Sequence, residues 1–302
     1  MTHDRPLLGI SLMLGFCVLA PLGDAVVKLI GQTVPLGQLV LARFAIQAAI
    51  LFPVVWMTRR TVRMSRRALR LTLLRTLLHI TGIAAMVTAL RYLPLADAVA
   101  IAFVMPFLML LLGKYVLGEE VGARRLIACI VGFAGTLLVI QPSFSEVGWP
   151  AFLPLVVALV FSLFMLVTRQ IAKETDPIAL QAVSGGMATV LLVPFLVLGP
   201  HLALPELTLV AIPPLETTLM VFIGLLGTLA HLLMTWSLRY APSATLAPMQ
   251  YLEIPFATLL GWAMFGDLPD TLASLGIMIT ICSGLYVLLR ERAMSRMAPQ
   301  VP

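Results

Sequence analysis

Charged residues are scarce in this chain of 302 residues. Asp, Glu, Lys and Arg together make up 11% of the sequence and hydrophobic residues make up 60%, while the mean hydropathy is +1.03. A soluble domain carries about 25% charged residues, so these values exclude a soluble globular protein. The composition predicts an integral membrane protein.

Cysteine and the common catalytic motifs are also scarce. The three cysteines, Cys17, Cys129 and Cys282, lie singly inside apolar stretches, so no metal or redox pair is expected. The sequence contains no His-Glu-x-x-His zinc motif and no Gly-x-Ser-x-Gly nucleophile turn. We therefore predict no metal site, no cofactor and no enzymatic activity.

The apolar residues fall into ten stretches that could each cross a bilayer. About 20 apolar residues span the roughly 30 Å of hydrocarbon, and backbone groups in lipid must be paired within a helix or a closed barrel. The predicted transmembrane helices are residues 7–30, 36–57, 70–90, 94–115, 122–141, 149–169, 177–198, 215–238, 242–265 and 270–290. The first stretch could be a cleaved signal peptide, but no clean small-x-small site precedes Asp24, so we expect it to be retained.

Basic residues are distributed unequally between the two sides of this predicted all-α bundle. With the N-terminus inside, sixteen of the 20 basic residues fall in the inner connections and the C-terminal tail, against Arg91 alone outside. Because Lys and Arg collect on the cytoplasmic side, both termini are predicted to be cytoplasmic. The arginine-rich stretch 59–70 is then a topology signal that touches anionic lipid. The net charge of +6 therefore needs no nucleic-acid partner.

A short motif occurs twice in the chain. Leu90-Arg91-Tyr92-Leu93 is echoed 148 positions later by Leu238-Arg239-Tyr240-Ala241, and a proline and a long apolar run follow each copy. Gly118-Glu119 and Gly266-Asp267 match at the same offset. Chance similarity between apolar helices is the alternative, but several turn residues at one offset favour duplication. With five helices in each half, 1–145 and 146–302, the second half is inverted relative to the first.

These features resemble the EamA branch of the drug/metabolite transporter superfamily. The resemblance also covers Leu41-Ala42-Arg43-Phe44, Ala89-Leu90-Arg91-Tyr92 and the acidic turn Gly118-Glu119-Glu120. Within that branch the chain is similar to bacterial YddG-type exporters of aromatic and other amino acids. The resemblance implies that helices 1–4 and 6–9 surround a central cavity, that helices 5 and 10 brace the outside, and that export proceeds by alternating access. One departure is that Arg43 has no basic counterpart in the seventh helix, which offers Gln181 and Ser184.

Polar residues at membrane depth are the candidate substrate contacts, because an ionisable group in hydrocarbon costs about 2.5–3.5 kcal/mol and must face a cavity or a partner. His79 lies near the middle of the third helix, where its imidazole could bind a carboxylate or carry a proton, or simply bridge two helices. The remaining candidates are Glu253, Gln250 and Tyr251 in the ninth helix, His231 in the eighth, and the aromatic residues Phe103 and Trp236.

Two prolines interrupt corresponding helices of the two halves. Pro106 and Pro255 each remove a backbone hydrogen bond and kink their helix, so both are predicted hinges for alternating access. The alternative is that they only shape packing, because proline is common in membrane helices.

A polar cluster is predicted in the outer half of the first repeat. Asp24 and Lys28 are four residues apart on one helical face, and Arg43, Arg91 and Asp97 lie at similar depth. They could form an ion-pair network between helices, a polar vestibule for zwitterions, or both.

The leading functional hypothesis is a monomeric secondary transporter that exports amino acids or related small metabolites through the lipid bilayer. The resemblance to bacterial exporters implies that this bilayer is a bacterial inner membrane. A membrane enzyme acting on lipid-linked substrates is the first alternative, although the intramembrane carboxylates are scattered. A passive channel is the second, and it differs from a carrier in that its flux is linear in the gradient.

Overall fold

The computed structural model describes residues 5–140, 147–202, 204–267 and 271–297, and within these ranges the chain is helical and contains no strand. The helices of the first half are α1 (Pro6–Ile30), α2 (Leu36–Met57), α3 (Arg66–Leu90), α4 (Leu95–Ala102), α5 (Met105–Leu117) and α6 (Ala123–Ile140). Those of the second half are η1 (Trp149–Phe152), α8 (Leu153–Ala172), α9 (Pro177–Leu198), η2 (Gly199–Leu202), η3 (Pro205–Leu207), α10 (Pro214–Tyr240), α11 (Ser243–Gln250), α12 (Glu253–Phe265) and α13 (Thr271–Met297).

Seven segments of the described chain are long and apolar enough to cross a membrane. They are Pro6–Ile30, Leu36–Met57, Arg66–Leu90, Leu95–Leu117, Trp149–Ala172, Pro177–Leu198 and Pro214–Tyr240, and shorter apolar helices cover Leu126–Gly135, Glu253–Phe265 and Ser274–Tyr286. The protein is therefore an all-helical, multi-pass membrane protein. The predicted count of ten spans stays a prediction.

The start of α3 differs from the predicted one. The helix begins at Arg66, inside the arginine-rich stretch, because the Ser65 side chain accepts a hydrogen bond from the Ala68 backbone N–H at 3.0 Å and so caps the first turn. The helix thus extends beyond the apolar residues on which the predicted boundary of 70 rested.

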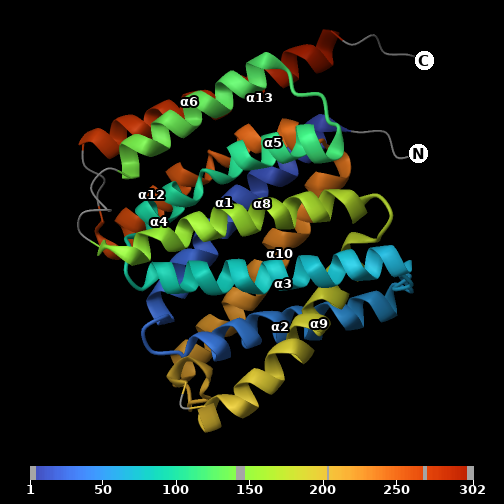
Figure 1. Cartoon of the computed structure of the whole chain (residues 1–302), viewed down its shortest axis with the longest axis vertical. Coiled ribbons are helices and arrows are strands. Elements are labelled where there is room, and N and C mark those ends of the chain that lie inside the picture. Colours follow the sequence, from blue (N-terminus) through green and yellow to red (C-terminus); the bar gives the residue numbers. More distant parts are fainter. Residues whose placement is uncertain (1–4, 141–146, 203, 268–270, 298–302) are drawn as a thin grey trace.

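The helices lie side by side, and each half packs onto the other by matching pairs (Figure 1). Helix α3 packs on α8, and in the same way α10 packs on α1. Helices α2 and α9 pack on each other, as do α6 and α13 at one edge of the bundle. When α1, α2, α3 and α6 are exchanged for α8, α9, α10 and α13, the pair of α3 and α8 becomes the pair of α10 and α1, and the other two pairs stay the same.

Glycines allow two of these pairs to approach closely. A Cβ atom on Gly185 of α9 would lie 3.1 Å from the Ala48 backbone nitrogen of α2. A Cβ on Gly135 of α6 would lie 2.8 Å from the Gly276 carbonyl oxygen of α13. In lipid there is no hydrophobic driving force between helices. Small residues at such crossings allow close van der Waals packing, which holds the helices together instead.

Two of the predicted helices, 94–115 and 242–265, are each interrupted near the middle. The first break, at Phe103 and Val104, separates α4 from α5, and Pro106 follows it. The second, at Tyr251 and Leu252, separates α11 from α12, and Pro255 follows it. The prolines thus stand just inside the helices that begin after the breaks, where a missing N–H costs little.

The two ends of the bundle differ in charge. Helix α1 begins and α13 ends at the same end, to the right in Figure 1. This end, here called the basic end, also carries the connection between α2 and α3 with Arg59, Arg60 and Arg63. At the opposite end Arg91 donates to the Glu206 carboxylate at 2.7 Å, and Glu206 also accepts from the Leu36 backbone N–H at 3.1 Å. The hydrogen bond from Arg91 holds the pKa of Glu206 below its ordinary value.

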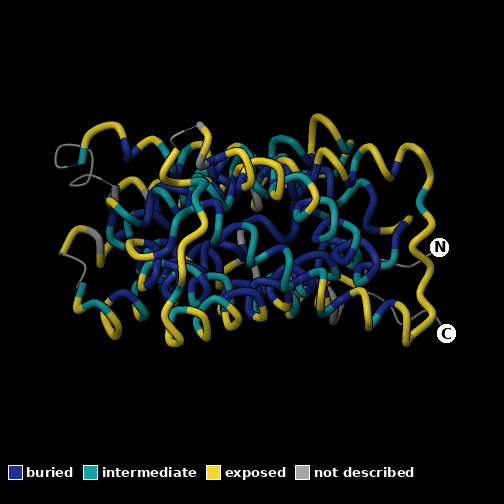
Figure 2. Tube along the Cα trace, turned by 90° about the horizontal axis from the view of Figure 1, so that it is seen from below, coloured by how far each residue is buried: buried dark blue, intermediate teal, exposed yellow. Residues whose placement is uncertain are grey.

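Burial separates the inside of the bundle from its surface. In Figure 2 the buried segments run through the centre of the elongated molecule and the exposed ones lie at its periphery. Many exposed positions carry large apolar side chains such as Leu77, Val190 and Leu229. An apolar periphery is expected where lipid replaces water, so candidates for a binding site are sought among the buried polar residues.

Candidate substrate cavity

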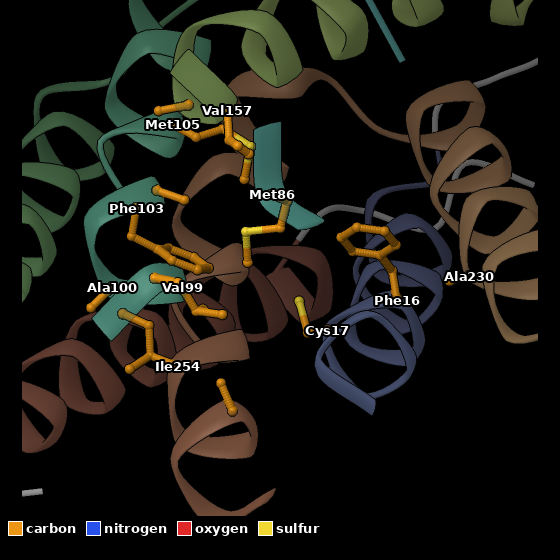
Figure 3. Close-up of a cluster of buried hydrophobic side chains, with 14 of the residues drawn as sticks. Phe16, Cys17, Met86, Val99, Ala100, Phe103, Met105, Val157, Ala230 and Ile254 are labelled. Atoms are coloured by element: carbon orange, nitrogen blue, oxygen red, sulfur yellow. The ribbon is translucent and has the colours of Figure 1, made fainter. Parts of the chain in front are cut away.

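A cavity of about 100 Å³ lies between α1, α2, α3, α4, α5, α8, α10 and α12. Its lining is mostly apolar and includes the phenyl rings of Phe16, Phe103 and Phe161. In Figure 3 the side chains of Phe16 and Phe103 lie on either side of Met86. Phenyl rings and thioethers offer polarizable surfaces that favour an apolar or aromatic group. The cavity is therefore suited to hold a ring.

The cavity is displaced away from the basic end. The residues that α3 contributes, Gly82 to Val87, lie in the last third of that helix, which starts at the basic end. Nearer the basic end the interior is filled by side chains with no exposed surface, among them Arg75, Phe164 and Gln181. In this conformation the layer towards the basic end is closed.

Four polar side chains enter this apolar cavity, each from a different helix. They are Asp24 of α1, Arg43 of α2, His231 of α10 and Glu253 of α12. The Arg43 Nη2 atom lies 3.2 Å from His231 Nδ1. Asp24 lies near enough to Arg43 and to Glu253 for an electrostatic interaction with each. A cavity in a membrane protein thus holds two carboxyl groups, one guanidinium and one imidazole.

Several polar atoms of this group have no hydrogen-bond partner among the described residues. They are Arg43 Nε, His231 Nε2 and Glu253 Oε2. The His231 Nδ1 atom also lies 2.9 Å from the Gly227 carbonyl oxygen, so the tautomer decides which of its two neighbours it bonds. Unpartnered donors and acceptors beside an apolar wall are the pattern of a site that binds a polar ligand.

Gly227 makes room for the guanidinium group of Arg43. A Cβ atom at this position would collide with the end of the Arg43 side chain. Because that end is flexible, Gly227→Ala should displace the guanidinium from His231 while leaving the fold intact.

We expect Gly227→Ala to lower transport by about tenfold, since losing a charge-assisted hydrogen bond costs roughly 1.5–3 kcal/mol. Counterflow in proteoliposomes and thermal melting in detergent would be measured together. Gly122→Ala is the matched control, because a Cβ there meets nothing within 4 Å. Normal transport by Gly227→Ala would show that the position of Arg43 does not matter.

His79 lies behind the cavity wall and is not part of the lining. Its ring centroid is 4.3 Å from that of His231, 4.6 Å from that of Phe164 and 5.0 Å from that of Phe44. Both ring nitrogens lack a hydrogen-bond partner within the described part of the chain. His79 therefore contacts the site through His231 in this conformation.

The other predicted contacts are divided between the cavity and the surrounding core. Phe103 lines the cavity. Gln250 donates to the sulfur atom of Met165 at 3.1 Å in the filled layer. Tyr251 points towards α6, where its hydroxyl donates to the Cys129 carbonyl at 3.0 Å and its ring packs against Gly132. Trp236 packs in a separate apolar cluster between α2, α9 and α10.

The predicted vestibule is divided as well. Asp24 and Arg43 line the cavity, but Lys28 turns to Asp267 at 3.3 Å. Lys28 also lies 4.7 Å above the Phe265 ring, so α12 and its following turn offer it both an anion and an aromatic face. Asp97 lies in the first turn of α4, where a negative charge is favourable, and outside the lining.

Sequence reasoning missed three residues of the site region. Phe161 and Gly227 have no chemical signal of their own in a chain rich in apolar residues. Arg75 did have one, because it is an ionisable residue inside the predicted span 70–90. The rule that singled out His79 applies to Arg75 equally.

Comparison with known proteins agrees with this architecture. A sequence model of the EamA-like transporter family matches residues 7–141 and again residues 148–289. The chain belongs to the EamA-like transporter family. It is accordingly a membrane transporter of the drug/metabolite transporter superfamily and not an enzyme.

EamA relatives with a named cargo transport different molecules. A riboflavin transporter of Rhizobium johnstonii is 29% identical over 234 residues, which cover 74% of this chain and 72% of that protein. An S-adenosylmethionine uptake transporter of Rickettsia bellii is 23% identical over 291 residues, 96% of each chain. One solved crystal structure superposes with a TM-score of 0.71 at 18% identity, over 96% of this chain and 98% of that one, and so shares the fold.

Proposed function

We propose that this EamA protein is a bacterial inner-membrane transporter that works by alternating access and carries a small molecule bearing both an aromatic ring and an α-amino acid group. The cavity carries this proposal. Its phenyl rings would hold the ring of the substrate, Arg43 and His231 would bind the carboxylate, and Asp24 and Glu253 would bind the ammonium group.

An inverted repeat of two five-helix halves, 1–145 and 146–302, supports alternating access. Arg91 donates to the Val34 carbonyl at 3.3 Å, and its counterpart Arg239 donates to the Thr175 carbonyl at 2.9 Å. Val34 follows the first helix of its half and Thr175 follows the first helix of the other. The two motif arginines therefore make the same clamp at opposite ends of the bundle. Ten spans around a central cavity, with Pro106 and Pro255 as hinges, complete the proposal.

The basic end faces the cytoplasm in this proposal, because the positive-inside bias applies to the arginines there. The cavity then lies in the half of the bundle away from the cytoplasm, and the cytoplasmic layer is closed. A cavity of about 100 Å³ holds only a few water molecules, so substrate binding must widen it.

Amino acids with aromatic side chains and S-adenosylmethionine both have the required ring and amino acid group. Export of amino acids, predicted from the sequence, stays a proposal, and the relative named for S-adenosylmethionine uptake favours the opposite direction. Riboflavin is the second candidate because of the relative from Rhizobium johnstonii, although it would leave the charges of Asp24 and Arg43 without partners in the substrate.

Counterflow in proteoliposomes tests this function in either direction. Liposomes loaded with unlabelled phenylalanine, tryptophan, S-adenosylmethionine or riboflavin would receive the labelled compound outside. We expect saturable exchange that exceeds net flux for at least one of the first three. Exchange of riboflavin alone would overturn the charged substrate class, and flux linear in the gradient would indicate a channel.

A further inference from the structure

Arg75 of α3 is fully buried in the filled layer towards the basic end. Its Nε atom donates to Thr168 Oγ1 and its Nη1 atom to Ser184 Oγ, both at 2.8 Å. The guanidinium carbon lies 4.4 Å above the ring of Phe164. None of these partners is acidic, and the ion pairs found between described residues do not include Arg75.

The environment of Arg75 leaves its charge uncompensated. Two hydroxyls orient the guanidinium but do not neutralise it, and the Nη2 atom has no partner among the residues that the structure describes. A buried charge without an anion is strongly unfavourable, and such residues in membrane helices mark substrate or ion pathways.

The need to hold neighbouring helices together does not explain why this position is an arginine. In the same layer Gln47 of α2 donates to the Gln181 carbonyl at 2.7 Å. Gln181 of α9 in turn donates to Thr235 Oγ1 of α10 at 2.9 Å. Neutral amides thus join three helices here without a buried charge, and neither amide is among the described residues that have a buried unpartnered atom.

Arg75 is also connected to the cavity by a continuous column of side chains. The column runs from Arg75 to Phe164 at 4.4 Å, then to His79 at 4.6 Å and to His231 at 4.3 Å. His231 is 3.2 Å from Arg43 in the cavity lining. Arg75 precedes the lining residue Gly82 by seven positions, or roughly 10 Å along α3, on the side of the basic end.

We propose that Arg75 is a second substrate subsite, which binds an anionic group of the cargo, a carboxylate or a phosphate, when the layer towards the basic end opens. The guanidinium fork of arginine matches both groups and keeps its charge when buried. The unpartnered Nη2 atom supplies a free donor, and Thr168 and Ser184 hold the fork in place. This inference rests on the proposed transport function and adds a second anion site to it, distinct from Arg43.

A matched pair of probes tests the subsite through transport. S-adenosylmethionine and its decarboxylated analogue differ only in the carboxylate, and counterflow of both would be measured. In Arg75→Gln we expect exchange of S-adenosylmethionine to fall at least tenfold and exchange of the analogue to change less than twofold, while Arg75→Lys retains part of the difference. Arg70→Gln is the control on the same helix, because Arg70 is exposed. Equal losses for both probes would overturn the subsite.

Chemical modification tests the subsite without relying on a particular cargo. In a Glu119→Ala variant, phenylglyoxal modification of Arg75 would be followed by peptide mass spectrometry. This variant should open the basic end, because the Glu119 carboxylate accepts hydrogen bonds from Arg169 of α8 and from the Ala244 backbone N–H of α11 and so joins the two helices. We expect 20 mM acetate or phosphate, compared with chloride at equal ionic strength, to slow modification of Arg75 at least threefold and to leave Arg63 unaffected. Stronger protection by one anion identifies the preferred group. If neither anion protects Arg75 from modification, the subsite is overturned even if transport is normal. If an anion protects Arg75 but none of the tested compounds is exchanged in counterflow, only the proposed cargo is overturned.

Discussion

We expect Arg43→Gln to reduce counterflow of the preferred substrate by at least 100-fold. Arg43 is the only guanidinium in the described lining of the cavity, and it contacts His231 and interacts with the charge of Asp24. Truncating one member of a buried, hydrogen-bonded charge pair costs about 2–5 kcal/mol, which corresponds to a loss in binding of roughly 30-fold to several thousandfold. Counterflow in proteoliposomes with equal amounts of reconstituted protein would measure the effect.

Loss of Arg43 should also destabilise the fold, because Asp24 and Glu253 would remain in the cavity without a cation. A double variant, Asp24→Asn with Arg43→Gln, separates the two effects. Removing both charges should restore part of the melting temperature, since Glu253 is then the one carboxyl group left in the described lining, but it should not restore exchange of a zwitterion. If the double variant regains both stability and transport, Arg43 serves only to neutralise Asp24.

We expect Glu119→Ala to open the basic end of the bundle and to slow transport at least tenfold. The Glu119 carboxylate accepts from the backbone N–H of Ser243 at 3.2 Å and of Ala244 at 3.0 Å, at the start of α11. It also accepts from the Ser243 hydroxyl at 2.5 Å and from Arg169 of α8 at 3.3 Å. One carboxylate thus caps a helix and ties it to another, and its loss removes several charge-assisted bonds worth about 1.5–3 kcal/mol each.

A thiol in the filled layer would report this opening. Met165 has no exposed surface in the structure, so Met165→Cys, with the native cysteines replaced by alanine, should react slowly with maleimide. Adding Glu119→Ala should raise the rate at least tenfold. Asp267→Ala is the matched control, because Asp267 occupies the equivalent turn at the opposite end, where it pairs with Lys28. Equal labelling in the two variants would mean that Glu119 does not hold the basic end closed.

The ends of the helices could be predicted well where a proline or a capping residue stands at the end of an apolar stretch. Helix α2 runs from Leu36 to Met57 and α9 from Pro177 to Leu198, as predicted, because a proline stands at the start of each. Pro35 precedes α2, and Pro177 opens α9 after the capping side chain of Asp176. Local chemistry alone determines such boundaries.

The arrangement of the site could be predicted only in part. Depth in a span singled out Arg43, His231 and Glu253 as polar groups that need a cavity, but Arg43 and His231 are 188 residues apart in sequence and no local pattern pairs them. Lys28 illustrates the same difficulty. Its spacing from Asp24 favours a pair on α1, yet contacts with Asp267 and Phe265 from α12 and its turn compete successfully. Tertiary packing decides between such partners.

The unequal closure of the two ends bears on how the direction of transport is set. Glu119 and Arg169 are each only 11% exposed in their side chains, whereas Asp267 in the pair with Lys28 is 39% exposed. A carrier that is not coupled to an ion gradient must obey detailed balance, so the ratio of Vmax to KM is equal for both directions of movement. The more buried pair of Glu119 and Arg169 therefore cannot by itself restrict transport to one direction. Any difference that it causes between the two sides in KM is matched by an equal factor in Vmax, and net direction follows from the side on which the cell consumes the substrate.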